Sequence, residues 1–199
     1  MSRTPALVAL CLLLTACGSS AQVNAGGTIP RSLLAGVRPI GRGPRFQPPV
    51  RGAAGGACTT PLGRRAQAHI ELFAANRVVL LATGIGTRAP RRVSDGRLTS
   101  ARCFGRLVTL DPTGTVYFRP GARPTLGELF RAWGEPLTRS RLASFRGGRV
   151  RVYIDGRRAS LPVAAVQLEQ DAEIVLELGP YIPPHTHFSF PAPPSPDLR

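Results

Sequence analysis

Hydrophobic residues recur with a regular period only in residues 58–181, and this limits the part of the chain that can build a core. Residues 18–57 hold nine glycines, five prolines, five arginines and no acidic residue. The last twenty residues contain seven prolines. Segments of this composition bury too little apolar surface to offset the entropy lost on ordering. The sequence therefore predicts one domain at 58–181, after a disordered tether at 17–57 and before an extended or disordered tail at 182–199.

The periodicity within the domain predicts a mixed α+β fold. Apolar and polar residues alternate over 68–74, which is the two-residue period of a β-strand. We expect a sheet of four to five strands, a polar loop at 88–102 and a weak helical turn at 139–144. The further strands are expected at 78–81, 115–118, 150–154 and 172–178.

One helix is expected over residues 126–133. Thr125 and Glu128 form a capping box before it, its apolar residues share one face, and Gly134 follows where a left-handed glycine ends many helices. Asp155-Gly156 predicts a type I′ hairpin turn. The order of a strand hairpin, a strand, this helix and a final strand pair resembles the β-grasp, the ubiquitin-like arrangement.

The N-terminus has the pattern of an export signal. Arg3 precedes nine apolar residues at 6–14, a run that is too short to span a bilayer. The following Leu14-Thr15-Ala16-Cys17 is similar to the lipobox of bacterial lipoproteins. The resemblance implies a signal peptide at 1–16, cleavage before Cys17 and a lipid on its sulfur, which places the protein on the extracytoplasmic face of the cell membrane. The alternative is an ordinary secretory signal with an incidental cysteine.

The cysteine count predicts one disulfide bond. Of the four cysteines, Cys11 would leave with the signal peptide and Cys17 would carry lipid. Cys58 and Cys103 would then remain in an oxidising compartment, where two cysteines commonly pair. Two free thiols are the alternative.

Five strings of the domain suggest a family. They are residues 69–73, 83–86, 111–114, 125–134 and 150–156, of which the last two are the most telling. Together they resemble a group of extracytoplasmic proteins found mainly in actinobacteria and without an assigned activity. The resemblance covers roughly residues 58–191.

Some members of that family carry a histidine cluster, and this chain departs from it. In those members three histidines alternate on the first strand, where this chain has Arg65, Gln67 and His69. A second string of two histidines and an aspartate precedes the third strand in those members, and this chain keeps only the aspartate, Asp111. A cation site needs three or four converging ligands, so His69 and Asp111 alone fall short. The sequence therefore predicts no bound metal and no cofactor.

Other candidate chemistry is weak. His185 and His187 would face one side of an extended segment, but the proline-rich tail favours two solvated histidines over a metal site. Asp171 and Glu173 alternate at the edge of a predicted strand, which is commonly a solvated face. The sequence has no nucleophile elbow and no dinucleotide-binding loop, so we expect no catalytic residue and no enzyme.

The charge of the chain is compatible with an anionic partner. All 26 basic residues are arginine, against 11 acidic residues, and the formal net charge is +15. The export signal argues against nucleic acid and leaves membrane lipid, an anionic envelope polymer or a protein partner, with a purely compositional origin of the excess as the alternative. We therefore expect a lipid-anchored, non-enzymatic binding or interaction module. The alternative is a metal-handling or enzyme-accessory domain with a degraded histidine site.

The lipid anchor is tested by the substitution Cys17→Ser. Wild-type protein should stay with membranes in high salt, because acyl chains hold it there and peripheral arginine contacts are screened. The variant should remain unprocessed at the lipoprotein site or be shed, as measured by membrane fractionation and immunoblotting. Mature variant protein that still fractionates with membranes in high salt would contradict the anchor.

Overall fold

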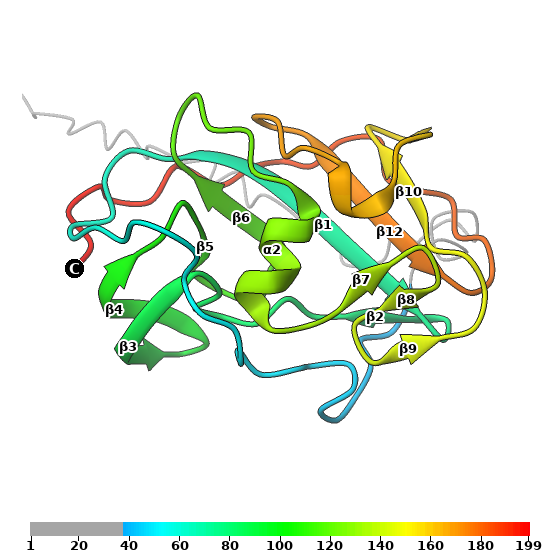
Figure 1. The fold of residues 1–199 in the computed structure, drawn as a ribbon, viewed down its shortest axis with the longest axis horizontal. Coiled ribbons are helices and arrows are strands. Elements are labelled where there is room, and N and C mark those ends of the chain that lie inside the picture. The colour runs from blue at the N-terminus through cyan, green and yellow to red at the C-terminus, as the bar shows by residue number, and fades with distance from the viewer. Residues whose placement is uncertain (1–37) are drawn as a thin grey trace, which may run out of the picture.

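The computed structural model describes residues 38–199 (Figure 1). The predicted signal peptide, Cys17 and the first part of the predicted tether lie outside the described residues. Within the described part of the chain, no helix is long and apolar enough to cross a membrane.

A seven-stranded mixed sheet forms the centre of the fold, where the sequence predicted four to five strands. Its order is β11-β10-β12-β1-β6-β5, and β2 pairs with β1 off this path. The strands are β1 (Ala66–Ala74), β2 (Arg77–Val79), β5 (Leu107–Thr109), β6 (Thr115–Phe118), β10 (Arg151–Ile154), β11 (Arg157–Arg158) and β12 (Glu173–Leu178). The α+β class predicted from the sequence is confirmed.

β1 and β12 are the two longest strands of this sheet. They lie side by side at its centre and run parallel. β2 forms a hairpin with the second half of β1, and the hairpin of β10 and β11 extends the sheet beyond β12. The resulting order, β2-β1-β12-β10-β11, is that of a β-grasp. β5 and β6 are additional, and β6 pairs with the first half of β1.

The helix α2 (Leu126–Trp133) lies across one face of the sheet (Figure 1). Thr125 Oγ1 accepts a hydrogen bond from Glu128 N at 3.2 Å, and Gly134 ends the helix at φ 86°, so the N-cap and the glycine cap are confirmed. The Glu128 carboxylate contacts Arg106 at 3.4 Å and does not complete the predicted capping box. The alternating residues of β1 that face the helix are apolar and join its buried side in one core. This core includes Ala68, Ile70, Leu72, Leu129, Phe130, Trp133, Ile174 and Leu176.

Two expectations about local structure were wrong. The predicted polar loop is a hairpin of β3 (Thr87–Ser94) and β4 (Arg97–Phe104), and the predicted helical turn is a small sheet of β7 (Leu137–Thr138), β8 (Arg141–Leu142) and β9 (Phe145–Arg146). Most of β3 is exposed on both faces, so the hydrophobic alternation that marks a strand is missing. The strands of the small sheet have only two residues each, too few for any period.

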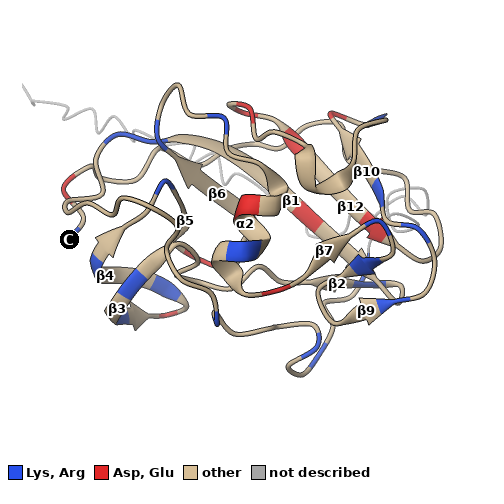
Figure 2. Ribbon diagram, in the orientation of Figure 1, with Lys and Arg blue, Asp and Glu red and all other residues tan. Residues whose placement is uncertain are grey.

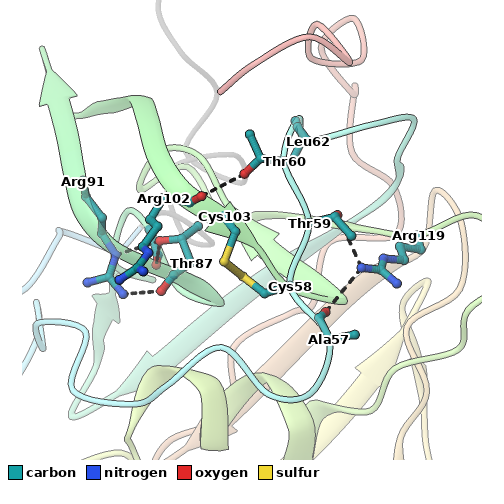
Figure 3. Close-up of a disulfide and its surroundings, with 12 residues drawn as sticks. Ala57, Cys58, Thr59, Thr60, Leu62, Thr87, Arg91, Arg102, Cys103 and Arg119 are labelled. Atoms are coloured by element: carbon teal, nitrogen blue, oxygen red, sulfur yellow. Dashed lines mark hydrogen bonds between the residues drawn. A yellow bond between two sulfur atoms is a disulfide. The ribbon is translucent and has the colours of Figure 1, made fainter.

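A disulfide bond joins Cys58 to Cys103, as predicted (Figure 3). It attaches the segment before β1 to β4. Thr59 and Phe104 exchange two backbone hydrogen bonds of 2.9 and 2.8 Å beside it, and Thr60 Oγ1 donates to Arg102 O at 2.8 Å. The bond therefore fixes the β3–β4 hairpin to the start of the main sheet.

The end of the predicted tether belongs to the folded domain. Phe46 and Val50 pack against the main core, and Trp133 Nε1 donates to Pro48 O at 3.1 Å. The backbone N–H groups of Arg51 and Gly52 both donate to Trp133 O at 2.9 Å, which satisfies a carbonyl at the end of α2. The domain therefore begins before residue 58. Its apolar contacts there are single residues without a period, which explains why the sequence pattern did not show them.

The proline-rich tail has no regular secondary structure, as expected, but it also packs on the sheet. Ile182 is buried with Phe73, Tyr153 and Val175 on the face opposite α2. At the far end of the tail, Leu198 O accepts a hydrogen bond from Leu62 N at 2.8 Å. Both faces of the sheet are therefore covered. The helix covers one face, and the other is covered by the tail over β1, β10 and β12 and by β4 at the β5–β6 end.

A truncation tests where the domain begins. A chain that starts at residue 53 loses Phe46 and Val50 and leaves the Trp133 N–H without its acceptor, whereas a chain that starts at residue 38 keeps both. We expect the shorter chain to be less stable by at least about 3 kcal/mol, because it loses two partly buried apolar side chains, the hydrogen bond of Trp133 Nε1 and the two backbone hydrogen bonds to Trp133 O. Urea unfolding followed by tryptophan fluorescence measures this difference. Equal unfolding midpoints would show that residues 38–52 contribute nothing.

Candidate functional site

The strand register places a histidine beside a glutamate on the sheet face that the tail covers. Side chains alternate along β1, so His69 and Glu71 point away from α2 while Ala68, Ile70 and Leu72 face it. In the parallel pair of β1 and β12, His69 is the direct partner of Glu173. Two titratable side chains that are 104 residues apart in sequence are therefore neighbours.

Both side chains are buried. His69 is 4% exposed and Glu173 is 1% exposed. The expectation that Glu173 lies on a solvated strand edge was wrong, because β12 is an interior strand and the tail covers its second face. A charge in such a place needs a partner, since removing it from water is costly.

The hydrogen bonds of His69 assign its ring nitrogens. Nε2 lies 2.9 Å from Thr113 O, which can only accept, so Nε2 carries a hydrogen and donates it. Nδ1 lies 2.7 Å from Glu173 Oε2. Burial by itself lowers the pKa of His69, but its hydrogen bond to Glu173, the charge of Glu173 and the contact with Thr113 O outweigh burial and raise the pKa above its ordinary value.

The tail supplies two further contacts. His185 Nδ1 lies 2.8 and 2.9 Å from the two carboxylate oxygens of Glu71. The ring of Phe188 stacks on His69, with the ring centroids 3.6 Å apart and the planes at 3°. His185 and Phe188 thus meet β1 at alternate residues and hold the tail against the site.

The sequence-predicted candidates are only partly brought together. His69 is at the centre of the site, whereas Asp111 accepts a hydrogen bond from Thr113 N at 3.2 Å and belongs to the turn that presents the Thr113 carbonyl. His185 and His187 do not converge, because His185 contacts Glu71 and His187 is exposed beside Thr186. The sequence analysis missed Glu71 as a site residue and interpreted Glu173 as a solvated strand residue. The alternation around His69 was visible, but their convergence depends on the pairing of β1 with β12.

A pocket of about 380 Å³ lies at the other end of the sheet, where β7 and β10 approach the short 3₁₀ helix η1 (Val163–Ala165). Val150, Val152 and Val163 are its buried apolar residues. Figure 2 shows many basic segments around β7 to β10. The arginines that line the pocket are Arg139, Arg149, Arg151 and Arg158.

The pocket arginines differ in their partners. Arg151 lies 3.1 Å from the buried carboxylate of Glu177 and also donates to Gly179 O at 2.7 Å. Arg139, Arg149 and Arg158 are exposed, and in the described part of the chain their guanidinium groups have no ion pair or hydrogen bond. Three guanidinium groups are therefore available to a ligand.

Comparisons with known proteins found no relative of this chain. No protein-family model, no curated protein and no solved structure matches the chain.

Gly114 tests how tightly the turn before β6 fits His69. Its φ is +94°, and a Cβ atom there would lie 2.6 Å from Ile70 O and 2.8 Å from His69 Nε2. Gly114→Ala should therefore cost roughly 2–5 kcal/mol, from the left-handed backbone and from displacement of His69. Urea unfolding gives the difference in the free energy of unfolding.

Gly121→Ala is the matched control. Gly121 has φ +73°, and a Cβ atom there would meet no other atom within 4 Å. The same change at this position should therefore cost only the backbone strain of roughly 1–2 kcal/mol. Equal losses at the two positions would show that the fit around His69 is loose.

Proposed function

We propose that this chain is a lipid-anchored protein of the cell surface whose domain is a non-enzymatic binding module for an anionic polymer of the envelope. The N-terminal signal and Cys17 support the anchor. The arginine-lined pocket supports the ligand class, and it is the observation that carries the proposal.

The pocket has the chemistry of an anion site. Guanidinium groups present fixed forks of N–H donors that match phosphate and carboxylate oxygens. Arg139, Arg149 and Arg158 surround an apolar floor and are not neutralised by glutamate or aspartate within the described residues. Bringing three such groups together is unfavourable unless an anion or solvent ions compensate their charge.

The basic surface continues beyond the pocket, which favours a polymer over a single small anion. A neighbouring depression shares Thr138 with the pocket and is lined by Arg141 and Arg146. Another shares Arg158 and is lined by Arg157. Residues 139–158 contain seven arginines and one aspartate. A strip of this kind suits a ligand with repeated negative charges.

The location of the protein selects the ligand. On the extracytoplasmic face of a membrane, polymers with phosphodiester or carboxylate groups are the abundant anions with repeated charge. A lipid anchor would keep the domain close to them, and this proximity raises the effective concentration of the ligand.

A charge-matched pair of variants tests the proposal. We expect replacement of Arg139, Arg149 and Arg158 by glutamine to weaken binding to poly(glycerol phosphate) about a hundredfold, because each basic residue near an anionic surface contributes about 1 kcal/mol. The full chain in detergent is used, and binding to immobilised polymer is measured at low and at high salt. Wild-type binding should fall as salt rises.

The control replaces Arg88, Arg92 and Arg102 of the β3–β4 hairpin by glutamine. These arginines are also exposed, and the net charge falls by the same amount. The control should bind nearly as well as wild type. If both triple variants lose the same affinity, the arginine excess acts only through net charge, and if wild type does not bind, the polymer is the wrong partner.

A further inference from the structure

We propose that His69, Glu71 and Glu173 form a binding site for one divalent transition-metal ion, for which Zn²⁺ is the test ion. The inference does not depend on the anion-binding proposal, because the two sites share no residue. Each of the three residues offers one ligand atom, and these atoms lie within 4.8 Å of one another. The sequence predicted no metal because it could count only His69 and Asp111, and the fold brings a different set together.

His69 is held as metal-binding histidines commonly are. Such a histidine usually donates its second ring N–H to a carbonyl or carboxylate, which fixes the orientation and the tautomer. Here Nε2 donates to Thr113 O at 2.9 Å, which leaves Nδ1 as the nitrogen that faces Glu173 and that, in the neutral ring, carries the lone pair able to bind an ion. Phe188, stacked on the ring, and the close backbone of Gly114 prevent the imidazole from turning away.

Glu173 supplies a second and independent observation. Its Oε1 atom is buried and has no hydrogen-bond partner among the described residues, although the residue is only 1% exposed. Its Oε2 atom lies 2.7 Å from His69 Nδ1. Two lone pairs at this distance repel each other unless a cation, either a proton or a metal ion, lies against them. A metal ion would compensate both the repulsion and the unsatisfied oxygen, whereas a proton between the two atoms leaves Oε1 without a partner.

The charges around His69 are negative in a strongly basic chain. The charged groups that act on His69 are Glu173 and Glu71. Two carboxylates and one neutral imidazole carry a net charge of minus two, which attracts a divalent cation. The mixture of nitrogen and oxygen donors suits Zn²⁺ and similar transition metals, whereas Ca²⁺ and Mg²⁺ prefer oxygen ligands alone.

There is space and access for an ion. A small cavity of about 80 Å³ borders His69 and Glu71 on the side of Thr113, and Glu173 is not among its lining residues. The side chain of Glu71 is 19% exposed, so it connects the buried pair to the surface. His185 contacts the Glu71 carboxylate from the tail, and we assign it a positioning role that orients Glu71.

The test uses the full chain, purified without a histidine tag and stripped of metal with a chelator. Isothermal titration with Zn²⁺ near neutral pH should show one ion bound per chain, and elemental analysis after gel filtration should show the same stoichiometry. We expect His69→Gln and Glu173→Gln to weaken binding by at least about a hundredfold, since loss of an outer-shell partner alone commonly costs 10–100-fold. His185→Ala should cost about tenfold on the same scale.

Glu71→Gln keeps the test decisive if the buried variants fail to fold. Glu71 is partly exposed, and its amide replacement preserves shape, so this variant should fold and still bind Zn²⁺ at least about tenfold more weakly. His187→Ala and Glu169→Gln are the controls, because each removes an exposed group of the same type from outside the cluster. Both controls should bind like wild type.

Two outcomes would overturn the site. One is a metal-free wild-type chain that takes up no stoichiometric Zn²⁺, which would mean that a proton alone joins His69 to Glu173. The other is stoichiometric binding that Glu71→Gln leaves unchanged or that His187→Ala abolishes, which would place the metal elsewhere.

Discussion

The parallel pairing of β1 with β12 is the constraint on which the rest of the structure depends. It joins the first and last strands of the domain and creates a sheet with two faces that must be covered. One face is apolar and packs on α2 in the usual way for an α+β domain. The other carries histidine and glutamate as well as apolar residues, and the pairing places His69 directly beside Glu173. The core and the polar cluster therefore arise from a single register.

The C-terminal tail decides what the second face becomes. Without the tail, the glutamates of β12 would be exposed to solvent, which is what their alternation with apolar residues in the sequence indicates. Ile182, His185 and Phe188 instead close over this face, so Glu173 and Glu177 are buried and must find partners. Glu177 finds them in an arginine and in the backbone N–H of the tail, whereas Glu173 retains an oxygen without one among the described residues. The difference between these two carboxylates identifies the cluster around His69 as unusual.

The domain thus separates two electrostatic environments. Arginines that lack acidic partners within the described residues surround an open pocket at the end of the sheet where β10 meets η1, and a compact acidic cluster lies under the tail. Cations favour the second and anions the first, so the two surfaces do not compete for the same ligand. The basic side of this separation is local, because residues 139–158 alone carry seven arginines, whereas the acidic cluster depends on the nonlocal pairing of β1 with β12.

The sequence alone determined the features that short segments control. The helix caps at Thr125 and Gly134, the α+β class and the Cys58–Cys103 bond follow from local backbone preferences, periodicity and the number of cysteines. So does the hairpin turn after β10, where Asp155 and Gly156 both have positive φ, as a type I′ turn requires. The tertiary structure alone decided the start of the domain, the β3–β4 hairpin and the burial of Glu173. These features depend on contacts between distant segments. The sequence pattern of an isolated apolar residue, an exposed strand or an alternating glutamate is the same whether or not another segment covers it.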